Sequence, residues 1–302
     1  MARRVNRKKV SQKAAIPNYS EANRVTSGPD PKLAIIALLL VVLLIGSGLY
    51  LTSIVEEAPE VAYGVEAELL TDNHKTEPGH STDFVIIIKN TGSITDTFDI
   101  GVKSNDGGFT IKVEDNYESV VVEKGKRIPI IVNVKTSESS KGSLYSYMEV
   151  KSRGDSMQTA DIKLNVDTDH KFGNQTSLGN SVSVHYAGIL AANAKLFDSS
   201  MEYIWDNYMY RKDGVTNQNK HIATLNANNI GCDAEGYPTS DCKGGRGMIK
   251  GFDNKMVNMY EGQTLSVRIP AVDAYGAQKD PSEPDGLAGE DLIFTIEMVS
   301  ID

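Results

Sequence analysis

The longest apolar stretch of the sequence runs from Leu33 to Val55 and contains no charged residue. A helix over these residues would rise roughly 34 Å at about 1.5 Å per residue, enough to cross a hydrocarbon core of roughly 30 Å. We therefore expect residues 33–55 to form a transmembrane helix in contact with the lipid bilayer. A cleaved signal peptide is the alternative, but the polar stretch before the run and the run itself are both longer than such a peptide requires.

The segment that precedes this run, residues 1–32, contains eight lysine and arginine residues but only two acidic ones. Basic segments next to a membrane span remain in the cytoplasm, so we expect a disordered basic cytoplasmic tail and extracytoplasmic domains after Val55. The tail carries a net charge of +6. Because the formal net charge of the whole chain is -9, the predicted exported part carries -15. Such a charge excludes nucleic-acid binding there, because neutralising phosphates requires a basic face. The tail itself is either a topology signal, which we favour, or a contact for anionic lipid or nucleic acid.

Residues 62–168 show short β-branched runs at the spacing of strands. Phe84 to Ile88 form one apolar run, and apolar residues alternate with others from Ile128 to Val134. Further runs occur at 111–113, 120–122 and 162–166. Turn sequences such as Pro78-Gly79 and Lys124-Gly125 separate them. This pattern predicts an all-β antiparallel sandwich.

Within that segment, Pro78-Gly79 is followed by an apolar run that ends in Lys89-Asn90-Thr91-Gly92, and then by Asp96-Thr97-Phe98. This order is similar to immunoglobulin-like domains of exported prokaryotic proteins, sometimes called NEW3 domains. The segment shows no nucleophile with a base and no phosphate loop, so we expect a spacer or a client-binding surface. The segment also contains five scattered acidic residues: Asp96, Asp99, Asp106, Glu114 and Asp115. They could form a calcium site, but we favour the interpretation that they are solvated surface residues.

Residues 176–302 predict an α+β domain, an antiparallel sheet wrapped on a short helix. Val182, Val184 and Tyr186 alternate on one face of a strand, which points His185 away as a surface histidine. A short helix is expected over residues 253–259. Strands are expected at 264–269, where Leu265, Val267 and Ile269 alternate, and at the C-terminus, where Phe294, Ile296 and Met298 share a face. A helix across the concave face would bury these stripes and leave an aromatic-lined hollow.

Several motifs of this domain recur in one order and spacing. They are Val182 to Leu190, Phe197-Asp198-Ser199-Ser200, Met248 to Asp253, Met259-Tyr260-Glu261-Gly262, Ile269 to Gly276, and Leu292 to Glu297. Together they resemble the FKBP family of peptidyl-prolyl cis-trans isomerases, over residues 176–302 with an insert at 201–246. The resemblance implies an enzyme that acts on proline-containing polypeptides without a metal or other cofactor.

The resemblance also assigns roles to residues. It implies a pocket lined by Tyr186, Phe197, Met248, Ile249, Phe252, Tyr275 and Phe294. Phe252, where many eukaryotic members have tryptophan, would be the floor under the proline ring, and Met248 would bind substrate. Asp198 would be the carboxylate beside the pocket, and the backbone N–H of Ile249 and the hydroxyl of Tyr275 would donate to substrate carbonyls. The alternatives are that Phe294 and Ile249 are ordinary core and that Asp198 caps a turn.

The insert at 201–246 holds several aromatic residues and both cysteines, Cys232 and Cys242. In an oxidising compartment a close pair of cysteines is more often a disulfide than a metal site, so we expect the two to be bonded. The aromatic residues either form a rim over the pocket that binds unfolded chain or bury the base of the insert itself.

The sequence as a whole predicts a single-pass membrane protein with an immunoglobulin-like sandwich and an extracytoplasmic FKBP-type isomerase that assists the folding of exported proteins. Two other functions stay open. One is a non-catalytic chaperone or client-binding module on the same fold, and the other is a surface structural or adhesive protein.

Overall fold

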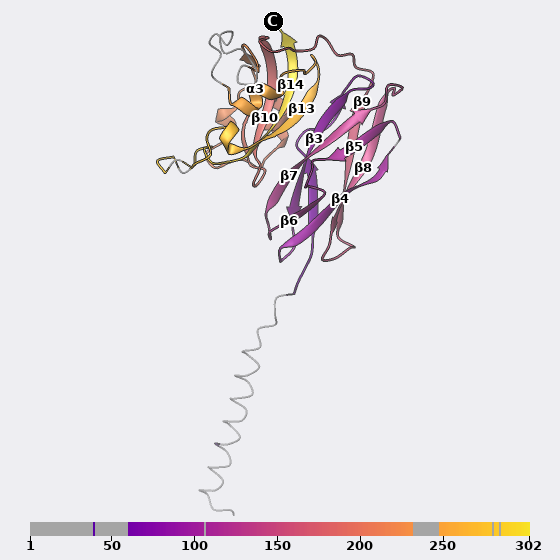
Figure 1. The fold of residues 1–302 in the computed structure, drawn as a ribbon. Helices are drawn as coiled ribbons and strands as arrows, with labels where there is room; N and C mark the ends of the chain where they lie inside the picture. The colour runs from indigo at the N-terminus through magenta and orange to yellow at the C-terminus, as the bar shows by residue number, and fades with distance from the viewer. Residues whose placement is uncertain (1–38, 40–59, 106, 232–247, 280, 284) are drawn as a thin grey trace, which may run out of the picture. The chain divides into compact units, whose positions relative to one another are not determined.

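The computed structural model describes residues 39, 60–105, 107–231, 248–279, 281–283 and 285–302 (Figure 1). Residues 60–302 form one compact unit, separate from residues 1–59, and the description concerns that unit. The predicted cytoplasmic tail and, apart from Leu39, the predicted membrane helix lie outside the described residues. Among the described residues there is no helix with the length and apolar character of a membrane span.

The first half of the unit is a sandwich of two sheets (Figure 1). One sheet has the strand order β1-β3-β7-β5 and the other β2-β9-β8-β4-β6. The strands of the first are β1 (Val65–Leu69), β3 (Ser81–Asn90), β7 (Arg127–Thr136) and β5 (Phe109–Val113). Those of the second are β2 (His74–Lys75), β9 (Thr159–Asp167), β8 (Ser143–Ser152), β4 (Asp96–Asn105) and β6 (Ser119–Val122). All pairs are antiparallel except β2 with β9.

The core of the sandwich is formed by alternate residues of both sheets, as the period of two along a strand requires. Phe84, Ile86 and Ile88 of β3 pack against Phe98 of β4 and Met148 of β8. Every apolar run that the sequence singled out between residues 84 and 166 lies inside one of these strands. The segment is therefore β-rich, as predicted.

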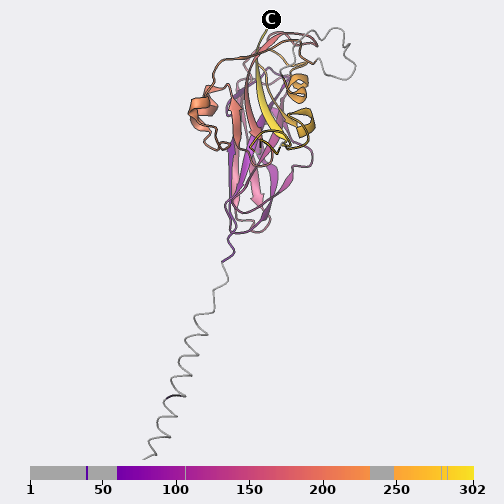
Figure 2. The same cartoon turned by 90° about the vertical axis from the view of Figure 1, so that its left-hand side faces the viewer.

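The second half contains a sheet with the order β11-β10-β14-β13, in which β12 also pairs with β10. Its strands are β10 (Val182–Leu190), β11 (Leu196–Ser199), β12 (Leu225–Ala227), β13 (Thr264–Ile269) and β14 (Leu292–Ile301). Helix α3 (Lys250–Lys255) lies on one face of this sheet (Figures 1 and 2). A core of Val182, Val184, Phe294, Ile296 and Met298 lies between helix and sheet, on the face that the alternation predicted.

Helix α3 begins three residues earlier than predicted and ends at Lys255, so the prediction of a helix over 253–259 is wrong in its bounds. The early start depends on Gly251, where a Cβ atom would lie only 2.4 Å from Cγ2 of Ile269 on β13. A glycine is a poor helix former, which concealed this turn in the sequence. The helical conformation does not extend to Asn258, whose φ is +65°.

The other face of this sheet packs on the sandwich. Ala187, Ile189 and Ile293 are buried in one cluster with Val85 and Ile87 of β3. Strand β3 is therefore buried on both faces, which explains its uninterrupted apolar sequence. The sandwich is a structural layer behind the C-terminal sheet in addition to any role as a spacer.

Polar bonds reinforce this packing along β13. The backbone N–H of Ser266 donates to Oδ2 of Asp83 at 2.8 Å, and Nε2 of Gln263 donates to the carbonyl of Ser81 at 2.9 Å. Burial raises the pKa of Asp83, and the Coulomb attraction of Lys255, 3.9 Å away, lowers it. The two halves of residues 60–302 thus share both an apolar core and hydrogen bonds.

The described part of the insert forms α2 (Glu202–Asn207), a 3-10 turn η1 (Asn217–Asn219) and β12. Trp205 and Tyr208 are buried in the cluster shared with the sandwich, and the guanidinium of Arg127 lies 4.0 Å from the ring centroid of Tyr210. Among the aromatic residues that the structure describes in the insert, only Tyr203 is exposed, at 44%. The geometry favours aromatic residues that bury the base of the insert over a rim of exposed rings. Cys232 and Cys242 lie outside the described residues, so the predicted disulfide stays a prediction.

Candidate active site

A hollow of about 190 Å³ lies between α3 and the sheet. It is lined by Tyr186, Phe197, Asp198, Leu225, Met248, Ile249, Phe252, Tyr275 and Phe294. Eight of these nine residues are the ones that the sequence assigned to a pocket, and the structure brings all eight together. They come from β10, β11, α3 with the two residues before it, the loop after β13, and β14.

Three phenylalanine rings form the apolar part of the hollow. The ring centroid of Phe294 lies 4.9 Å from that of Phe252 and 5.4 Å from that of Phe197, with interplanar angles of 77° and 82°. Edge-to-face contacts of this kind are favourable and fix ring orientation. Phe252 and Phe294 are only 3% and 4% exposed, so their rings serve as core and pocket wall at the same time.

Gly188 of β10 allows two of these rings to lie against the strand. A Cβ atom at this position would lie 2.5 Å from Cζ of Phe197 and 2.8 Å from Cε1 of Phe294. Real Cβ atoms do not approach ring atoms so closely, so any side chain at 188 would displace at least one ring. The shape of the hollow therefore depends on a residue that does not line it.

The polar side of the hollow is organised by Asp198. The hydroxyl of Tyr186 donates to Oδ2 of Asp198 at 2.5 Å, and the backbone N–H of Ser199 donates to Oδ1 at 2.8 Å. Burial, reinforced by the Asp198 carboxylate, raises the pKa of the Tyr186 hydroxyl. The Tyr186 hydroxyl therefore stays protonated and can donate. The Asp198 carboxylate accepts one hydrogen bond from the adjacent backbone and one from a residue of the pocket.

Two residues of the hollow, Ile249 and Tyr275, carry hydrogen-bond donors that have no acceptor among the described residues. The N–H of Ile249 donates to no acceptor among the residues that the structure describes, and Ile249 directly precedes α3. The hydroxyl of Tyr275, a side chain that is 52% exposed, has no hydrogen-bond partner in the same set. Burial, and then the Asp198 charge, raise the pKa of Tyr275, so this hydroxyl keeps its proton at neutral pH.

Other candidates from the sequence lie outside this hollow. His185 is partly buried and contacts Oγ of Ser200 at 3.2 Å, on the opposite side of β10. Four of the five acids considered for a calcium site have individual partners: Asp96 bonds Ser152, Asp99 pairs with Arg153, Glu114 with Arg268 and Asp115 with Lys112. The fifth, Asp106, lies outside the described residues. Across the described parts of the chain, no three histidine, cysteine or acidic residues are placed to hold a metal ion.

Sequence reasoning missed one residue of the lining, Leu225 of β12. The FKBP resemblance breaks off across the insert, so no motif assigned a side chain there. A signal was nevertheless present. Leu225 and Ala227 show strand alternation, and β12 pairs in register with Val182 and Val184 of β10.

Comparison with known proteins supports an FKBP-type domain at the C-terminus. The family model described as FKBP-type peptidyl-prolyl cis-trans isomerase matches residues 221–299. This range includes Leu225, Met248, Ile249, Phe252, Tyr275 and Phe294 of the hollow. Tyr186, Phe197 and Asp198 precede it but line the same hollow. No curated protein matches the chain.

Three of the solved structures that this chain is similar to are the following. A FixG-related protein from Vibrio parahaemolyticus is 7% identical, with 36% of this chain and 98% of that chain covered and a TM-score of 0.28. The ASH/PapD-like domain of human CEP192 is 10% identical, with coverages of 35% and 84% and a TM-score of 0.27. The secreted serine protease VesC from Vibrio cholerae is 7% identical, with coverages of 79% and 50% and a TM-score of 0.27.

Proposed function

We propose that the protein is a peptidyl-prolyl cis-trans isomerase that rotates X-Pro bonds in the hollow between α3 and the sheet. The observation that carries the proposal is the convergence of three phenylalanine rings with the donors of Ile249 and Tyr275, which meet no acceptor in the part of the chain that the structure describes. The hollow, at about 190 Å³, is smaller than the ~300–1,000 Å³ of sites for drug-sized ligands. Its size suits one side chain, such as a proline ring resting on Phe252.

The chemistry follows from the electronic structure of the amide. Resonance holds the bond planar with a barrier of about 18–20 kcal/mol and places negative charge on the carbonyl oxygen. Twisting the bond removes that resonance and makes the oxygen less polar. An apolar site that excludes water from this oxygen therefore binds the twisted amide better than the planar one, which is the condition for catalysis.

The polar groups orient the substrate. The N–H of Ile249 and the hydroxyl of Tyr275 would donate to carbonyl groups on the two sides of the rotating bond, so that one part of the chain is held while the other turns. Asp198 positions the Tyr186 ring through the 2.5 Å bond. No covalent bond forms or breaks, and no proton is transferred.

The place of action follows from the N-terminal sequence. Residues 33–55 would anchor the protein in the cell membrane with the basic tail inside, and the sandwich and isomerase domain would lie outside. The substrates would then be exported or membrane-proximal polypeptides that contain proline. A protease-protection assay on intact cells tests this arrangement, because a cytoplasmic C-terminal domain would resist digestion.

The activity is tested with the full chain in detergent and a short X-Pro peptide, by following isomer exchange with NMR. Asp198→Asn and Tyr275→Phe are each expected to lower kcat/KM by roughly 5- to 10-fold, the value of one hydrogen bond of about 1–1.5 kcal/mol. Tyr203→Phe is the matched control, since Tyr203 lies on α2 outside the hollow. Exchange no faster than in buffer would refute the proposal and favour a non-catalytic client-binding module.

A further inference from the structure

A second hollow, of about 410 Å³, adjoins the first. The two share the side chains of Phe197, Asp198 and Tyr275 as a common wall. The remaining lining of the second hollow consists of Lys212 and Val215 from the insert and Leu287 from the loop before β14. A polypeptide advances roughly 3.3–3.6 Å per residue, so a chain with proline in the first hollow can reach the second with a neighbouring residue.

The backbone around Lys212 is fixed against β11. The N–H of Lys212 donates to the carbonyl of Leu196 at 2.8 Å, and the N–H of Leu196 donates to the carbonyl of Tyr210 at 2.9 Å. Leu196 directly precedes Phe197 and Asp198 of the common wall. The N–H of Val215 donates to the carbonyl of Lys212 at 3.0 Å, which closes a turn. Lys212 is therefore held beside the hollow by β11 itself.

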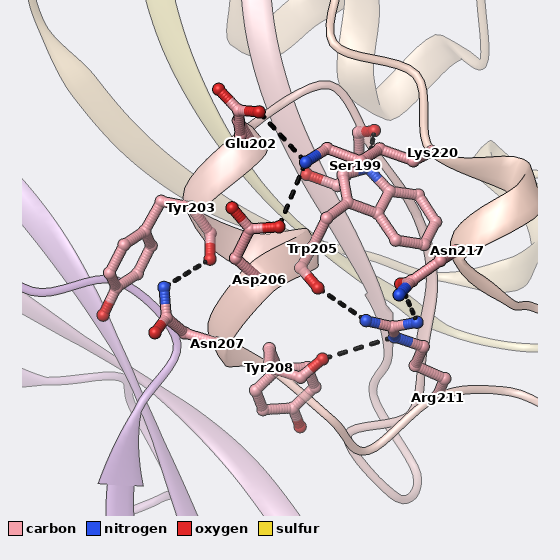
Figure 3. A network of polar contacts seen from close by, with 10 residues as sticks. All are labelled: Ser199, Glu202, Tyr203, Trp205, Asp206, Asn207, Tyr208, Arg211, Asn217 and Lys220. Carbon is pink, nitrogen blue, oxygen red and sulfur yellow. Dashed lines mark hydrogen bonds and ion pairs between the residues drawn. The ribbon is translucent and has the colours of Figure 1, made fainter.

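Arg211 also fixes this segment through its own hydrogen bonds (Figure 3). Its guanidinium donates to the carbonyl of Trp205 at 2.6 Å and to Oδ1 of Asn217 at 2.6 Å, and it lies 5.2 Å from the centroid of the Trp205 ring. The indole of Trp205 is buried and donates to the carbonyl of Ser199 at 2.7 Å. The neighbour of Lys212 is thus tied to a buried residue, which reduces the freedom of the whole turn.

The charge of Lys212 distinguishes it from the other lysines in this part of the chain. Lys195, Lys220, Lys250, Lys255 and Lys279 each lie within 4.0 Å of an acidic side chain. Among the described residues 176–302, Lys212 is the one lysine without an acidic partner. Lys212 lines the second hollow together with the apolar side chains of Val215 and Leu287, and the shared wall adds the carboxylate of Asp198.

We propose that this second hollow is a specificity subsite for an acidic residue next to the X-Pro bond of the substrate. Lys212 would pair with the carboxylate, and Val215 and Leu287 would contact the methylene groups of that side chain. The inference rests on the proposed isomerase function and adds a substrate class to it: polypeptides with glutamate or aspartate beside proline. The insert would then contribute to substrate choice through Lys212 rather than through exposed aromatic rings.

The test compares peptides that carry Glu or Gln, first directly before proline and then directly after it, with the full chain in detergent. In one of the two series we expect kcat/KM to be roughly 2- to 5-fold higher for Glu, the range of a partly exposed ion pair. This preference should disappear in Lys212→Gln, invert in Lys212→Glu and weaken in high salt. Lys220→Gln is the matched control, because Lys220 pairs with Glu202 and Asp206 on α2 and lines neither hollow.

Binding of the same peptides separates this inference from the proposed function. We expect tighter binding of Glu than of Gln peptides by the wild type, with the same dependence on Lys212, whether or not the peptide is turned over. Equal affinity and equal kcat/KM for Glu and Gln peptides in both series would overturn the subsite while leaving isomerase activity intact. Selective binding without turnover would instead refute the proposed function and retain the subsite.

Discussion

Arg268 on β13 donates two parallel hydrogen bonds to the carboxylate of Glu114, at 2.8 and 2.9 Å. The same guanidinium donates to the carbonyl of Pro129 at 3.0 Å and lies 4.2 Å from the centroid of the Tyr117 ring. Glu114 follows β5 of the sandwich, whereas β13 borders the face that packs on α3. This bidentate contact joins the two halves of the unit.

We predict that Arg268→Lys lowers the free energy of unfolding by about 1–3 kcal/mol, because lysine keeps the charge but cannot form the bidentate contact. The pair is mostly buried, with side chains 17% and 23% exposed. Arg153→Lys is the matched control, since its pair with Asp99 is 58% and 48% exposed and should change stability far less. Urea denaturation measures both, and equal effects would contradict a role for the contact in joining the halves.

We also predict that the C-terminal half does not fold without the sandwich. Expressed alone, residues 174–302 would expose Ala187, Ile189 and Ile293, which are buried against β3. Ile87→Ala in the full chain should cost about 2–5 kcal/mol, while Val121→Ala on β6, where the side chain is 66% exposed, should cost little. A cooperative thermal transition of the isolated half would show that the shared core is dispensable.

His74 predicts a pH dependence of stability. Complete burial lowers its pKa to about 3, and the neutral ring contacts the hydroxyls of Thr71 and Thr82 at 2.7 and 2.8 Å. Below about pH 6.5 His74 is protonated in the unfolded chain but stays neutral in the native protein. The free energy of unfolding should therefore fall by up to about 1.4 kcal/mol per pH unit between pH 6.5 and 3.

The variant His74→Gln isolates this contribution. It should be less stable than the wild type at pH 7.5, since it loses the stack on Phe84, where the ring centroids are 4.1 Å apart. The difference in free energy of unfolding should shrink as the pH falls below 6.5, because glutamine does not titrate. If denaturant unfolding gives the same difference in free energy of unfolding between the two proteins at every pH from 7.5 to 4.5, a buried neutral histidine is contradicted.

Gly188 predicts a loss of activity without direct contact with the substrate. Gly188→Ala should displace the ring of Phe197 or Phe294 and reduce kcat/KM by roughly tenfold or more, since overpacking costs about 1–3 kcal/mol. Gly101→Ala on β4 is the control, because a Cβ atom there meets nothing within 4 Å. If Gly188→Ala turns over an X-Pro peptide with unchanged kcat/KM, the placement of the two rings does not determine the activity.

The pocket was predictable from the sequence because its residues occur in motifs whose order and spacing survive the insert. Strand alternation correctly placed Val182, Val184 and the C-terminal strand on the face toward the helix. Leu225 and Lys212 were not assigned by these motifs, since both lie in the insert at 201–246. The alternation of Leu225 and Ala227 indicates a strand, but the pairing of that strand with β10, and of Lys212 with β11, depends on tertiary structure.

The packing of the sandwich on the sheet was also missed, although a signal for it exists. The run from Phe84 to Ile88 is apolar at every position, and such runs indicate a strand that is buried on both faces. Interpreted only as one strand of a sandwich, the run left Val85 and Ile87 without a partner. The structure supplies that partner in Ala187, Ile189 and Ile293.

The aromatic hollow is proposed to catalyse rotation about X-Pro bonds without chemistry at any covalent bond. The most direct measurement is cis-trans exchange of an X-Pro peptide by NMR, with and without the full chain, in H₂O and in D₂O. The account predicts exchange well above the rate in buffer, with the same kcat/KM in both solvents because no proton moves in the transition state. Exchange no faster than in buffer, or a large solvent isotope effect on the catalysed rate, would contradict it.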